Sequence, residues 1–503
     1  VFINNEIEVK SPLKDGEHEY IYFKDATAIR LEKLNLKDKS VLPIHYEVSP
    51  GLNISLAVFF LDQNKKKAGH IIIKPNKNNS LLLPKETAFV NFAFRIYQSG
   101  TCYVKNLIFG EKDLSPKNIL GDSETLLISN NYPSYDDLYK NGFVHSRVKA
   151  YKSRGKKIDV FRFKTEQAVS WHEFQNIDVI TGGEQALSSL LESGRYKTVL
   201  VHFLDNHMWS ILSKYIDDTK VVVWLHGAEI HPWYRRKFNI TSESHKEKLI
   251  EQSNNRIEFW KSILVSMHKN LKIVFVSQSF AEEVFEDLGF ELPRSQYQII
   301  HNPINTDLFA YRQKNINLRK KILSIRPFAS RQYANDITVD AILKLSSEPF
   351  FEELEFRIIG DGPLFEETLE PIANFDNVFI EKRFVPQSEI PQLHEQYGIF
   401  LCPTRWDSQG VSRDEAMSSG MAIVTTNTAA IPEFTDPSCA MVARDESSDS
   451  VAAKIKNLIE KPSLFSQISA NAAKRIRNTI CYKKVIDYFF RFFIFKYIGF
   501  SFI

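Results

Sequence analysis

Two different rhythms of apolar and polar residues divide the chain. From about residue 18 to 110, short segments alternate apolar and polar positions and are separated by turn clusters such as PGLN, QNKKKAG and PNKNNS. This period of two predicts strands joined by tight turns, and helical periodicity is nearly absent there. We therefore expect an antiparallel β-sandwich within residues 1–112, with the basic run 65–67 at the tip of a hairpin.

After a linker, the pattern changes to short apolar runs that alternate with helical segments, one of them near residues 243–268. This alternation is typical of α/β proteins whose parallel sheets are covered on both faces. It occurs twice, which predicts two Rossmann-like doubly wound domains over 124–305 and 306–484, followed by an aromatic tail over 485–503. Ligands of such sheets bind beyond the carboxyl ends of the strands, so candidate chemistry is expected there.

Composition excludes some classes of function without choosing one. The 503 residues include 64 Lys and Arg and 61 Asp and Glu, and the net charge of +3 lacks the basic excess of a dedicated nucleic-acid-binding protein. The 38 Phe and 19 Tyr favour sheet packing and contacts with sugars or lipids. The four Cys lie far apart, without a zinc-ligand or disulfide pattern, which favours a reducing, cytoplasmic location.

The two ends of the chain differ in what they indicate about membranes. The first residues lack the basic and apolar regions of a signal peptide and begin with Val, which suggests an excerpt or a truncated copy. No apolar stretch reaches the roughly 18 residues of a spanning helix. The aromatic C-terminal tail is interpreted as an interfacial amphipathic anchor or, equally, as a frameshifted end or an assembly contact.

The most informative segment follows the expected strand GIFLCPT. A small polar loop with Asp407 and Gly410 leads into a helix whose first turn is expected to contain Glu415. Ser412 and Glu415 have the spacing of a capping box, which is one explanation for Glu415. The other is an anion site, in which the glycine allows close backbone approach and the amides of Gly410 and Val411 bind phosphate or sugar hydroxyls.

With these residues, the chain resembles the family-four retaining glycosyltransferases of GT-B fold, the glycosyl transferases group 1. The family's hallmark is Glu, seven residues and Glu, followed by Ala-Met and Gly. Here Asp407 replaces the first Glu, and Glu415 is followed by Ala416, Met417 and Gly420. The shorter first acid is a departure from the family pattern.

The resemblance extends upstream and covers roughly residues 125–480. Arg326 and Arg331 have the spacing of the family's basic pair, and Gly360 and Gly362 lie in its common GDGP loop. In the first α/β domain, HGAE at 226–229, VSQS near 277 and HNPIN around 302 also match. Each motif is weak alone, but their order at strand ends makes coincidence improbable.

The resemblance implies a role for each group on the donor side. Arg326 and Arg331 would bind the diphosphate of a nucleotide-sugar as its negative charge grows, so neither a metal nor another cofactor is expected. Glu415 would accept hydrogen bonds from the ribose hydroxyls, and Asp407 would lie near the donor sugar. The base would contact the backbone of a segment made of Arg383, Phe384 and Val385. Both arginines have an alternative explanation as surface ion-pair partners.

On the acceptor side the signals are weaker. His226 closes a strand where it would touch the donor or acceptor sugar, although a lone histidine there is as often structural. Glu229, Arg235 and Arg236 are acceptor-side candidates, and the aromatic and basic loop around them would attract an anionic lipid-linked acceptor or a membrane surface. A solvated loop is the plainer interpretation.

The loop after the first strand of this domain departs from the family pattern. It carries only Gly142 where many relatives have a glycine pair, so its role toward phosphate is uncertain. His145 and Arg147 follow it and are interpreted as groups on a helix surface.

These observations predict a cytoplasmic retaining glycosyltransferase, with possible peripheral contact at the inner membrane face. It would move a sugar from a UDP- or GDP-linked donor to a surface polysaccharide, such as lipopolysaccharide or capsule, or to a lipid-linked saccharide. The sandwich would be an accessory module. Two alternatives stay open, a non-catalytic glycan-binding or scaffold protein derived from a transferase, and another GT-B enzyme such as an epimerase or a phosphorylase.

Overall fold

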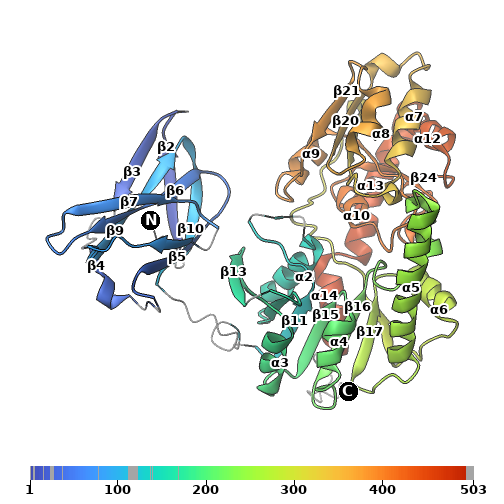
Figure 1. Cartoon of the computed structure of the whole chain (residues 1–503). Helices are drawn as coiled ribbons and strands as arrows, with labels where there is room; N and C mark the ends of the chain where they lie inside the picture. Colours follow the sequence, from blue (N-terminus) through green and yellow to red (C-terminus); the bar gives the residue numbers. More distant parts are fainter. Residues whose placement is uncertain are drawn as a thin grey trace, which may run out of the picture. The chain divides into compact units, whose positions relative to one another are not determined.

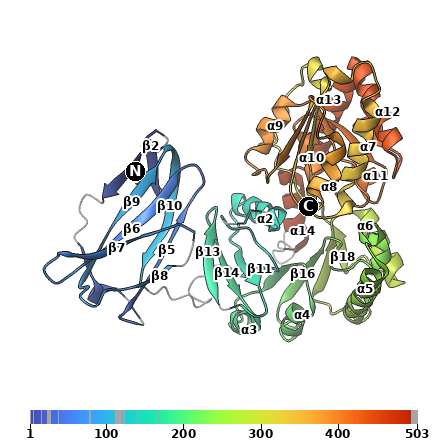
Figure 2. The same cartoon turned by 45° about the horizontal axis from the view of Figure 1, so that its top comes forward.

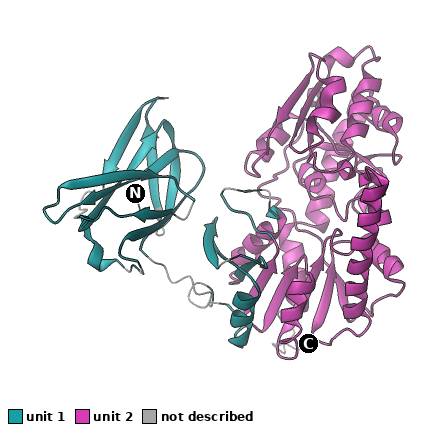
Figure 3. Ribbon diagram, viewed as in Figure 1, with its two compact units in different colours: residues 1–123, 131–142, 159–195 teal, residues 124–130, 143–158, 196–503 magenta. Residues whose placement is uncertain are grey.

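The protein is described by a computed structural model, which covers residues 2–3, 6–14, 16–22, 28–34, 36, 38–76, 79–110, 120, 123–135, 137–138, 140–167 and 169–493. It divides into two compact units (Figure 3). The first contains residues 1–123, 131–142 and 159–195, and the second contains residues 124–130, 143–158 and 196–503. Parts of the expected first α/β domain, 131–142 and 159–195, therefore cluster with the N-terminal sheets.

The first unit contains the expected antiparallel sandwich (Figure 1). One sheet has the order β1-β2-β10-β5-β8, and the other has the order β3-β9-β6-β7 with β4 paired to β9. The strands are β1 (Phe2–Ile3), β2 (Glu6–Pro12), β3 (His18–Tyr22), β4 (Ile29–Arg30), β5 (Val41–Val48), β6 (Asn53–Leu61), β7 (Lys67–Ile73), β8 (Asn79–Leu82), β9 (Phe89–Tyr97) and β10 (Ser99–Phe109).

Alternation within these strands builds the core. In β6, Ile54, Leu56, Val58 and Phe60 point into a buried cluster shared by both sheets. The turn from β6 to β7 holds the basic run at a hairpin tip, as expected, with a positive φ of 62° at Lys65. Two features were not anticipated from the pattern: β2, which precedes residue 18, and the 3-10 helix η1 (Leu31–Lys33), which follows the short β4.

The first unit also contains a short α/β segment. Strand β12 (Asp159–Phe163) runs parallel to β14 (Ile177–Gly182), which pairs antiparallel with β13 (Ser170–Phe174) and leads to α3 (Glu184–Glu192). The β13–β14 hairpin was not expected. Its turn residues Gln175 and Asn176 both have positive φ, 48° and 65°, which closes a two-residue turn without the usual glycine.

The second unit begins with a parallel sheet in the order β11-β15-β16-β17-β18, and we name residues 124–130, 143–158 and 196–303 the first lobe. Helices cover this sheet, and Figure 1 shows the long α5, which matches the helix expected near 243–268. Its elements are β11 (Thr125–Ser129), α2 (Gly142–Ser153), β15 (Thr198–His202), α4 (Asn206–Leu212), β16 (Lys220–Leu225), the 3-10 helix η2 (Trp233–Asn239), α5 (Glu243–Leu264), β17 (Leu271–Phe275), α6 (Gln278–Leu288) and β18 (Tyr297–Ile299).

Residues 304–481 form the second lobe, a parallel sheet in the order β21-β20-β19-β22-β23-β24 with helices on both faces (Figure 2). Its strands and longer helices are β19 (Lys321–Ile325), α7 (Asn335–Leu345), β20 (Glu355–Gly360), α8 (Phe365–Leu369), β21 (Val378–Lys382), α9 (Ile390–Gln396), β22 (Ile399–Leu401), α10 (Val411–Ser418), β23 (Ala422–Thr426), α11 (Ile431–Phe434), β24 (Met441–Ala443), α12 (Ser448–Glu460) and α13 (Pro462–Thr479). Short 3-10 turns complete it, namely η3 (Ile316–Lys320), η4 (Arg331–Tyr333), η5 (Phe351–Glu353) and η6 (Glu370–Ile372).

The chain passes between the two lobes twice at one place. Ile304 and Cys481 form an isolated parallel bridge, in which the Ile304 amide donates to the Ile480 carbonyl at 2.8 Å and the Tyr482 amide donates to the Ile304 carbonyl at 3.0 Å. The forward and return crossings therefore lie side by side.

After the second crossing, α14 (Tyr482–Phe493) packs on the first lobe. The Phe489 ring lies 5.0 Å from Tyr151 and 5.4 Å from Trp224, between ring centroids. This part of the expected aromatic tail is thus a packed helix, and residues 494–503 lie outside the described part of the chain. None of the described helices combines the length and the apolar character needed to cross a membrane.

Candidate active site

The loop before α10 has the geometry of an anion site rather than of a capping box. Gly410, at φ 91°, is the N-cap of α10 and supplies no side-chain cap, and the first bond of the helix runs from the Asp414 amide to the Gly410 carbonyl. Ser412 and Glu415 lie inside the helix, with Glu415 beyond the first turn, so the capping-box explanation is wrong. The amides that precede Asp414 begin a helix and favour a negative ligand.

Arg326, directly after β19, is a buried cation without a counter-ion. Its side chain is 5% exposed, and its guanidinium lies 5.0 Å above the Tyr333 ring. Nη1 donates to the Ser412 Oγ at 3.2 Å, whereas Nε and Nη2 are buried and have no hydrogen-bond partner among the described residues. The surface ion-pair explanation therefore does not apply to Arg326. A buried guanidinium with two unused donors needs an anion.

Arg331, the second member of the expected basic pair, differs from Arg326 in its exposure. Its side chain is exposed and lines a hollow together with Asp336, Asp340 and Glu367. No contact to Arg326 is found in the described residues. The 3-10 turn that begins with Arg331 is held by Arg405, whose Nη1 donates to the Arg331 carbonyl at 2.8 Å.

Arg236, from η2 of the first lobe, is the second cation near Arg326. Its Nη2 donates to the Gln332 Oε1 at 3.5 Å. Burial raises the pKa of Tyr333, and the positive charges of Arg326 and Arg236 and the negative charge of Asp407 all act on this phenol. The structure thus gathers one cation from each lobe and one carboxylate around Tyr333.

Glu415 lies beside the loop expected to hold the base. Its side chain is 9% exposed, and its Oε1 accepts from the Gln387 Nε2 at 3.0 Å. Burial raises the pKa of Glu415 to about 7, with a smaller raising effect from Asp414 and a lowering effect from Gln387. This carboxyl is therefore expected to change its charge near neutral pH. Hydroxyl groups of a ligand that donate to it would stabilise its ionised form.

Of the expected base-contacting residues, Arg383 is already engaged. Its guanidinium pairs with Glu381 at 2.6 Å and with Glu389 at 2.5 Å, and its amide donates to the Gly360 carbonyl at 3.0 Å. These two carboxylates raise its pKa. Phe384 is half-buried and Val385 is buried, and both follow it in the loop that leads to Gln387.

Gly360 and Gly362 make room for the loop that carries Arg326. A Cβ at Gly360 would lie 2.1 Å from the Arg326 carbonyl oxygen, and a Cβ at Gly362, at φ 145°, would lie 2.4 Å from the Phe328 carbonyl carbon. In this structure both glycines act by allowing a close backbone approach.

Asp407 and the residue Gln409, which sequence reasoning missed, shape the loop before α10. Asp407 is half-buried, and its Oδ1 accepts from the Gln409 amide at 3.1 Å. The Gln409 side chain accepts from the Asn302 amide at 2.6 Å and donates to the Asn302 carbonyl at 2.9 Å and to Asp414 at 3.1 Å. The sequence offered no motif for this glutamine, because its partner Asn302 lies over one hundred residues away.

His226, at the end of β16, is held neutral. Its Nε2 lies 2.9 Å from the His202 Nδ1, and its ring is 4.9 Å from Phe143 and 4.7 Å from Phe203. Burial and the positive charge of Arg147 lower the pKa of His226 to about 3. Among the described residues its Nδ1 has no hydrogen-bond partner. This nitrogen is therefore free to form a hydrogen bond with a sugar hydroxyl.

Glu229 stabilises the backbone that follows His226. Its carboxylate accepts from the amides of His226 and Gly227, the latter at 3.0 Å. Burial raises the pKa of Glu229 to about 7, although these amides and Arg256 lower it. Arg235, in contrast, forms ion pairs with Asp287 at 3.0 Å and with Glu286 at 2.6 Å.

Gly227 lies where the two lobes touch. At φ 132°, a Cβ on this residue would lie 2.4 Å from the Trp406 ring of the second lobe. The same ring packs 4.3 Å from His231, and its Nε1 donates to Glu283 at 2.8 Å. The glycine of the HGAE motif is therefore required for close contact of the lobes.

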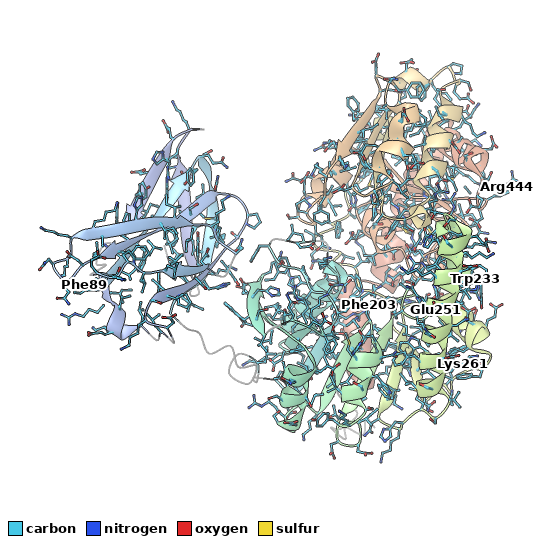
Figure 4. All side chains as sticks on the ribbon, in the orientation of Figure 1. Phe89, Phe203, Trp233, Glu251, Lys261 and Arg444 are labelled. Carbon is cyan, nitrogen blue, oxygen red and sulfur yellow. The ribbon has the colours of Figure 1, made fainter. Side chains whose placement is uncertain are left out.

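A cavity of about 500 Å³ lies at the strand ends of the first lobe. It is lined by aromatic, amide and charged side chains, including Phe203, Phe259, Asn255, Arg256 and Glu229. Phe203 (Figure 4) has a φ of 60°, which is uncommon for a bulky residue and is a sign of stored backbone strain.

The start of α2 differs from its interpretation as a surface helix. Gly142 is its first residue, with open space around a Cβ. His145 and Arg147 are buried, at 5% and 0% exposure. The Arg147 Nη2 donates to the His301 carbonyl at 3.2 Å and to the Asn302 Oδ1 at 3.3 Å, and its guanidinium lies 5.2 Å above the Trp224 ring. The surface prediction is wrong because long-range contacts bury this face.

No group of three or more His, Cys, Asp or Glu that could hold a metal ion occurs among the residues with described positions. All four cysteines are free thiols.

Comparisons with known proteins identify one domain and the fold. Residues 319–461 match the family model described as glycosyl transferases group 1. No curated protein sequence matches the chain.

Several solved structures share the fold at low sequence identity. A sucrose-phosphate synthase from Thermosynechococcus elongatus has 12% identity and a TM-score of 0.54, over 73% of this chain and 98% of its own. A glycosyltransferase from Rickettsia africae has 15% identity and a TM-score of 0.54, over 74% of this chain and 99% of its own. HepE from Anabaena, in complex with UDP and glucose, has 13% identity and a TM-score of 0.53, over 73% of this chain and 98% of its own.

The two lobes therefore have the GT-B fold, and the expected fold class is confirmed. Residues 319–461 thus match the glycosyl transferases group 1 family model, and they lie within a chain whose two lobes have the GT-B fold.

Proposed function

We propose that the protein is a retaining transferase that moves a sugar from a UDP- or GDP-linked donor to a saccharide or lipid-linked saccharide of a surface glycan, in the cytoplasm and without a metal ion. The observation that carries this proposal is Arg326, a buried guanidinium whose Nε and Nη2 have no partner among the described residues. It lies beside the N-terminus of α10. A diphosphate supplies the negative charge that both groups favour.

The donor would lie along the strand ends of the second lobe. Its diphosphate would contact Arg326, Arg236 and the first amides of α10, and its ribose hydroxyls would donate to Glu415. The segment from Phe384 to Gln387 would contact the base, since Gln387 is bonded to Glu415. In this assignment Arg236 replaces Arg331 as the second cation.

The acceptor would lie in the cavity of the first lobe. Phe203 and Phe259 offer apolar surfaces for sugar rings, and Asn255 and Glu229 offer polar contacts. His226 is neutral near pH 7, so it can contact a sugar hydroxyl without placing a second charge there. No protein nucleophile is needed, because an oxygen of the leaving phosphate would take the proton of the acceptor hydroxyl on the same face.

A membrane-bound acceptor has less support from the basic loop than the sequence suggested. Arg235 is neutralised by Asp287 and Glu286, and Arg236 is directed toward Gln332. We therefore retain a lipid-linked acceptor as one class within the proposal, with the saccharide as the part that is recognised.

Calorimetric titration with UDP and then GDP, in EDTA, tests the donor site. We expect one nucleotide to bind saturably and Arg326→Ala to weaken that binding at least tenfold, because a buried cation is removed from the phosphate site. Arg444→Ala is the matched control, since Arg444 is an exposed arginine of the same lobe.

Binding of neither nucleotide would overturn the donor assignment. Binding without transfer to any saccharide would favour the non-catalytic glycan-binding alternative. Retention is checked by the anomeric configuration of the product in a nuclear magnetic resonance spectrum, and an inverted product would contradict it.

A further inference from the structure

The outer face of the sheet β3-β9-β6-β7 carries a row of aromatic side chains. In antiparallel pairing, directly opposed residues share one face. Tyr20 is opposed to Arg95, and Phe59 is opposed to His70. Because the neighbouring positions Leu56 and Phe94 belong to the buried core, these pairs point away from it. We name this surface the aromatic face, and its members are Tyr20, Tyr22, Phe59, His70, Arg95 and Tyr97.

Four of these rings form a continuous row across three strands. The ring centroids of Tyr20 and Tyr22 are 6.3 Å apart, those of Tyr22 and Phe59 are 6.3 Å apart, and those of Phe59 and His70 are 6.0 Å apart. Their planes are inclined to one another by 25°, 24° and 13°. The row is therefore ordered by contacts between its own members.

A small residue allows this row to form. Tyr22 lies on β3 and Phe59 on β6, on either side of β9, where Ala93 is opposed to Tyr22. Ala93 is fully buried although it lies on the outer face, whereas Tyr22 is 59% exposed. The rings thus cover the centre of the sheet and stay accessible themselves. Exposed aromatic surface of this kind marks a binding site more often than a stabilising feature.

Arg95 is clamped within the row. Its guanidinium lies 5.6 Å from the Tyr20 ring and 4.9 Å from the Tyr97 ring. Its Nε is buried and has no hydrogen-bond partner among the described residues. Stacking between two phenols fixes the plane of the guanidinium while leaving donors unused, which suits a carboxylate or a sulfate.

The charge of this surface has one sign. Lys67 lies 5.3 Å from the Phe59 ring, and Arg30 and Lys65 lie 5.5 Å and 5.8 Å from the Phe89 ring at its edge (Figure 4). Among the described residues of β3, β4, β6, β7 and β9 that face outward, none is Asp or Glu. Within the described strands, the surface therefore combines aromatic rings with cationic side chains.

We propose that the aromatic face binds an acidic saccharide chain. Sugar rings present flat C–H surfaces that pack on aromatic rings, and hydroxyls that a wet surface tolerates. Carboxylate or sulfate groups on such a chain pair with Arg95 and Lys67. The choice of a saccharide rests on the proposed transferase function, whereas the preference for an acidic one rests on the charge of this face.

Calorimetric titration of the whole protein tests this site. The ligands are hexagalacturonate, a heparin-derived hexasaccharide and, as the neutral reference, maltohexaose. We expect at least one acidic ligand to bind at least tenfold more tightly than maltohexaose, and Tyr22→Ala with Phe59→Ala to weaken that binding at least tenfold. Arg95→Gln is expected to reduce the preference for the acidic ligand.

Leu82→Ala is the matched control, because Leu82 is 79% exposed on β8 of the opposite sheet. Arg326→Ala separates the two sites, since it removes nucleotide binding and leaves saccharide binding to the aromatic face intact. No binding of either acidic ligand, equal binding in the double variant, or co-sedimentation with phosphatidylglycerol vesicles instead of saccharide binding would overturn the proposal.

Discussion

The two lobes place different ionisable groups at the strand ends that form the candidate site. In the second lobe, the buried guanidinium of Arg326 has no ion pair among the described residues and lies next to the start of α10. In the first lobe, His226 has a pKa lowered to about 3, and Glu229 has a pKa raised to about 7. At the candidate site the second lobe thus presents a buried guanidinium, whereas His226 and Glu229 of the first lobe have pKa values shifted toward their neutral forms; Arg147 is a buried cation of that lobe as well.

This difference has a physical cause in what surrounds each group. Burial alone favours the neutral form of an ionisable group, and His226 follows it because Arg147 adds a repelling charge. The guanidinium of Arg326 is buried too, and no ion pair balances it among the described residues. In the proposed function, a nucleoside diphosphate would balance that cation, and a neutral sugar would contact the first lobe.

The largest expected effect is on Arg326. Arg326→Ala should lower kcat/KM by about 10²- to 10³-fold, because it removes a preorganised donor from the growing phosphate charge. Arg326→Lys should recover only part of this, since an ammonium lacks the planar fork. Initial-rate kinetics measure both, and turnover near that of the wild type would break the contrast between the lobes.

The contact between the lobes gives the next prediction. Gly227→Ala places a Cβ 2.4 Å from Trp406 at φ 132°, so we expect kcat/KM to fall by tens of fold and the melting temperature to drop. Gly289→Ala is the control, because φ there is 81° and a Cβ would meet nothing within 4 Å. It should lower the melting temperature while sparing kcat/KM. Equal kinetic effects would show that backbone strain, and not the approach of the lobes, matters at Gly227.

Two neighbouring arginines sharpen the comparison. Arg236→Ala should weaken nucleotide binding about tenfold by removing the charge that the first lobe lends to the donor site. Arg235→Ala should leave nucleotide binding unchanged, because Asp287 and Glu286 already neutralise it. Calorimetric titration of both variants with the nucleotide measures these effects. A larger loss of affinity in Arg235→Ala than in Arg236→Ala would show that Arg235, and not Arg236, contributes to the donor site.

The smallest expected effect is the pH dependence from Glu415. With a pKa of about 7, its ionised fraction rises about threefold between pH 6.5 and 7.5. Because the ionised form accepts from the ribose hydroxyls, nucleotide affinity should rise by a similar factor. Glu415→Gln is the reference, since the phosphate of the nucleotide also titrates nearby. Identical pH profiles for the wild type and the variant would remove Glu415 from ribose recognition.

The features of the fold that depend on local sequence patterns were predicted from the sequence. Runs of apolar residues identified the sandwich and both parallel sheets, and Gly410 marked the start of α10 correctly. The β13–β14 hairpin was missed because Gln175 and Asn176 adopt positive φ without a glycine to signal it. The hydrophobic period and the turn residues are properties of short segments. Predictions that rest on them therefore need no knowledge of the fold.

Contacts between distant segments were beyond this kind of reasoning. The spacing of Arg326 and Arg331 suggested a pair, but the chain turns between them, and Arg236 arrives from η2 of the other lobe. Arg147 reads as a surface residue because nothing near it in sequence shows that His301 and Asn302 cover it. Roles that depend on which lobes meet therefore require the three-dimensional structure.

The paired crossings at Ile304 and Cys481 have a mechanical consequence. A single connecting strand would let the two lobes swing and twist in any direction. Two segments joined by hydrogen bonds through Ile304 are instead expected to act as a hinge. The lobes could open and close about this hinge, whereas sliding and twisting of one lobe against the other would be resisted. If the lobes close in this way, Arg236 and Arg326 would return to the same relative position each time. The two crossings of the chain would thus align the residues that the two lobes contribute to the candidate site.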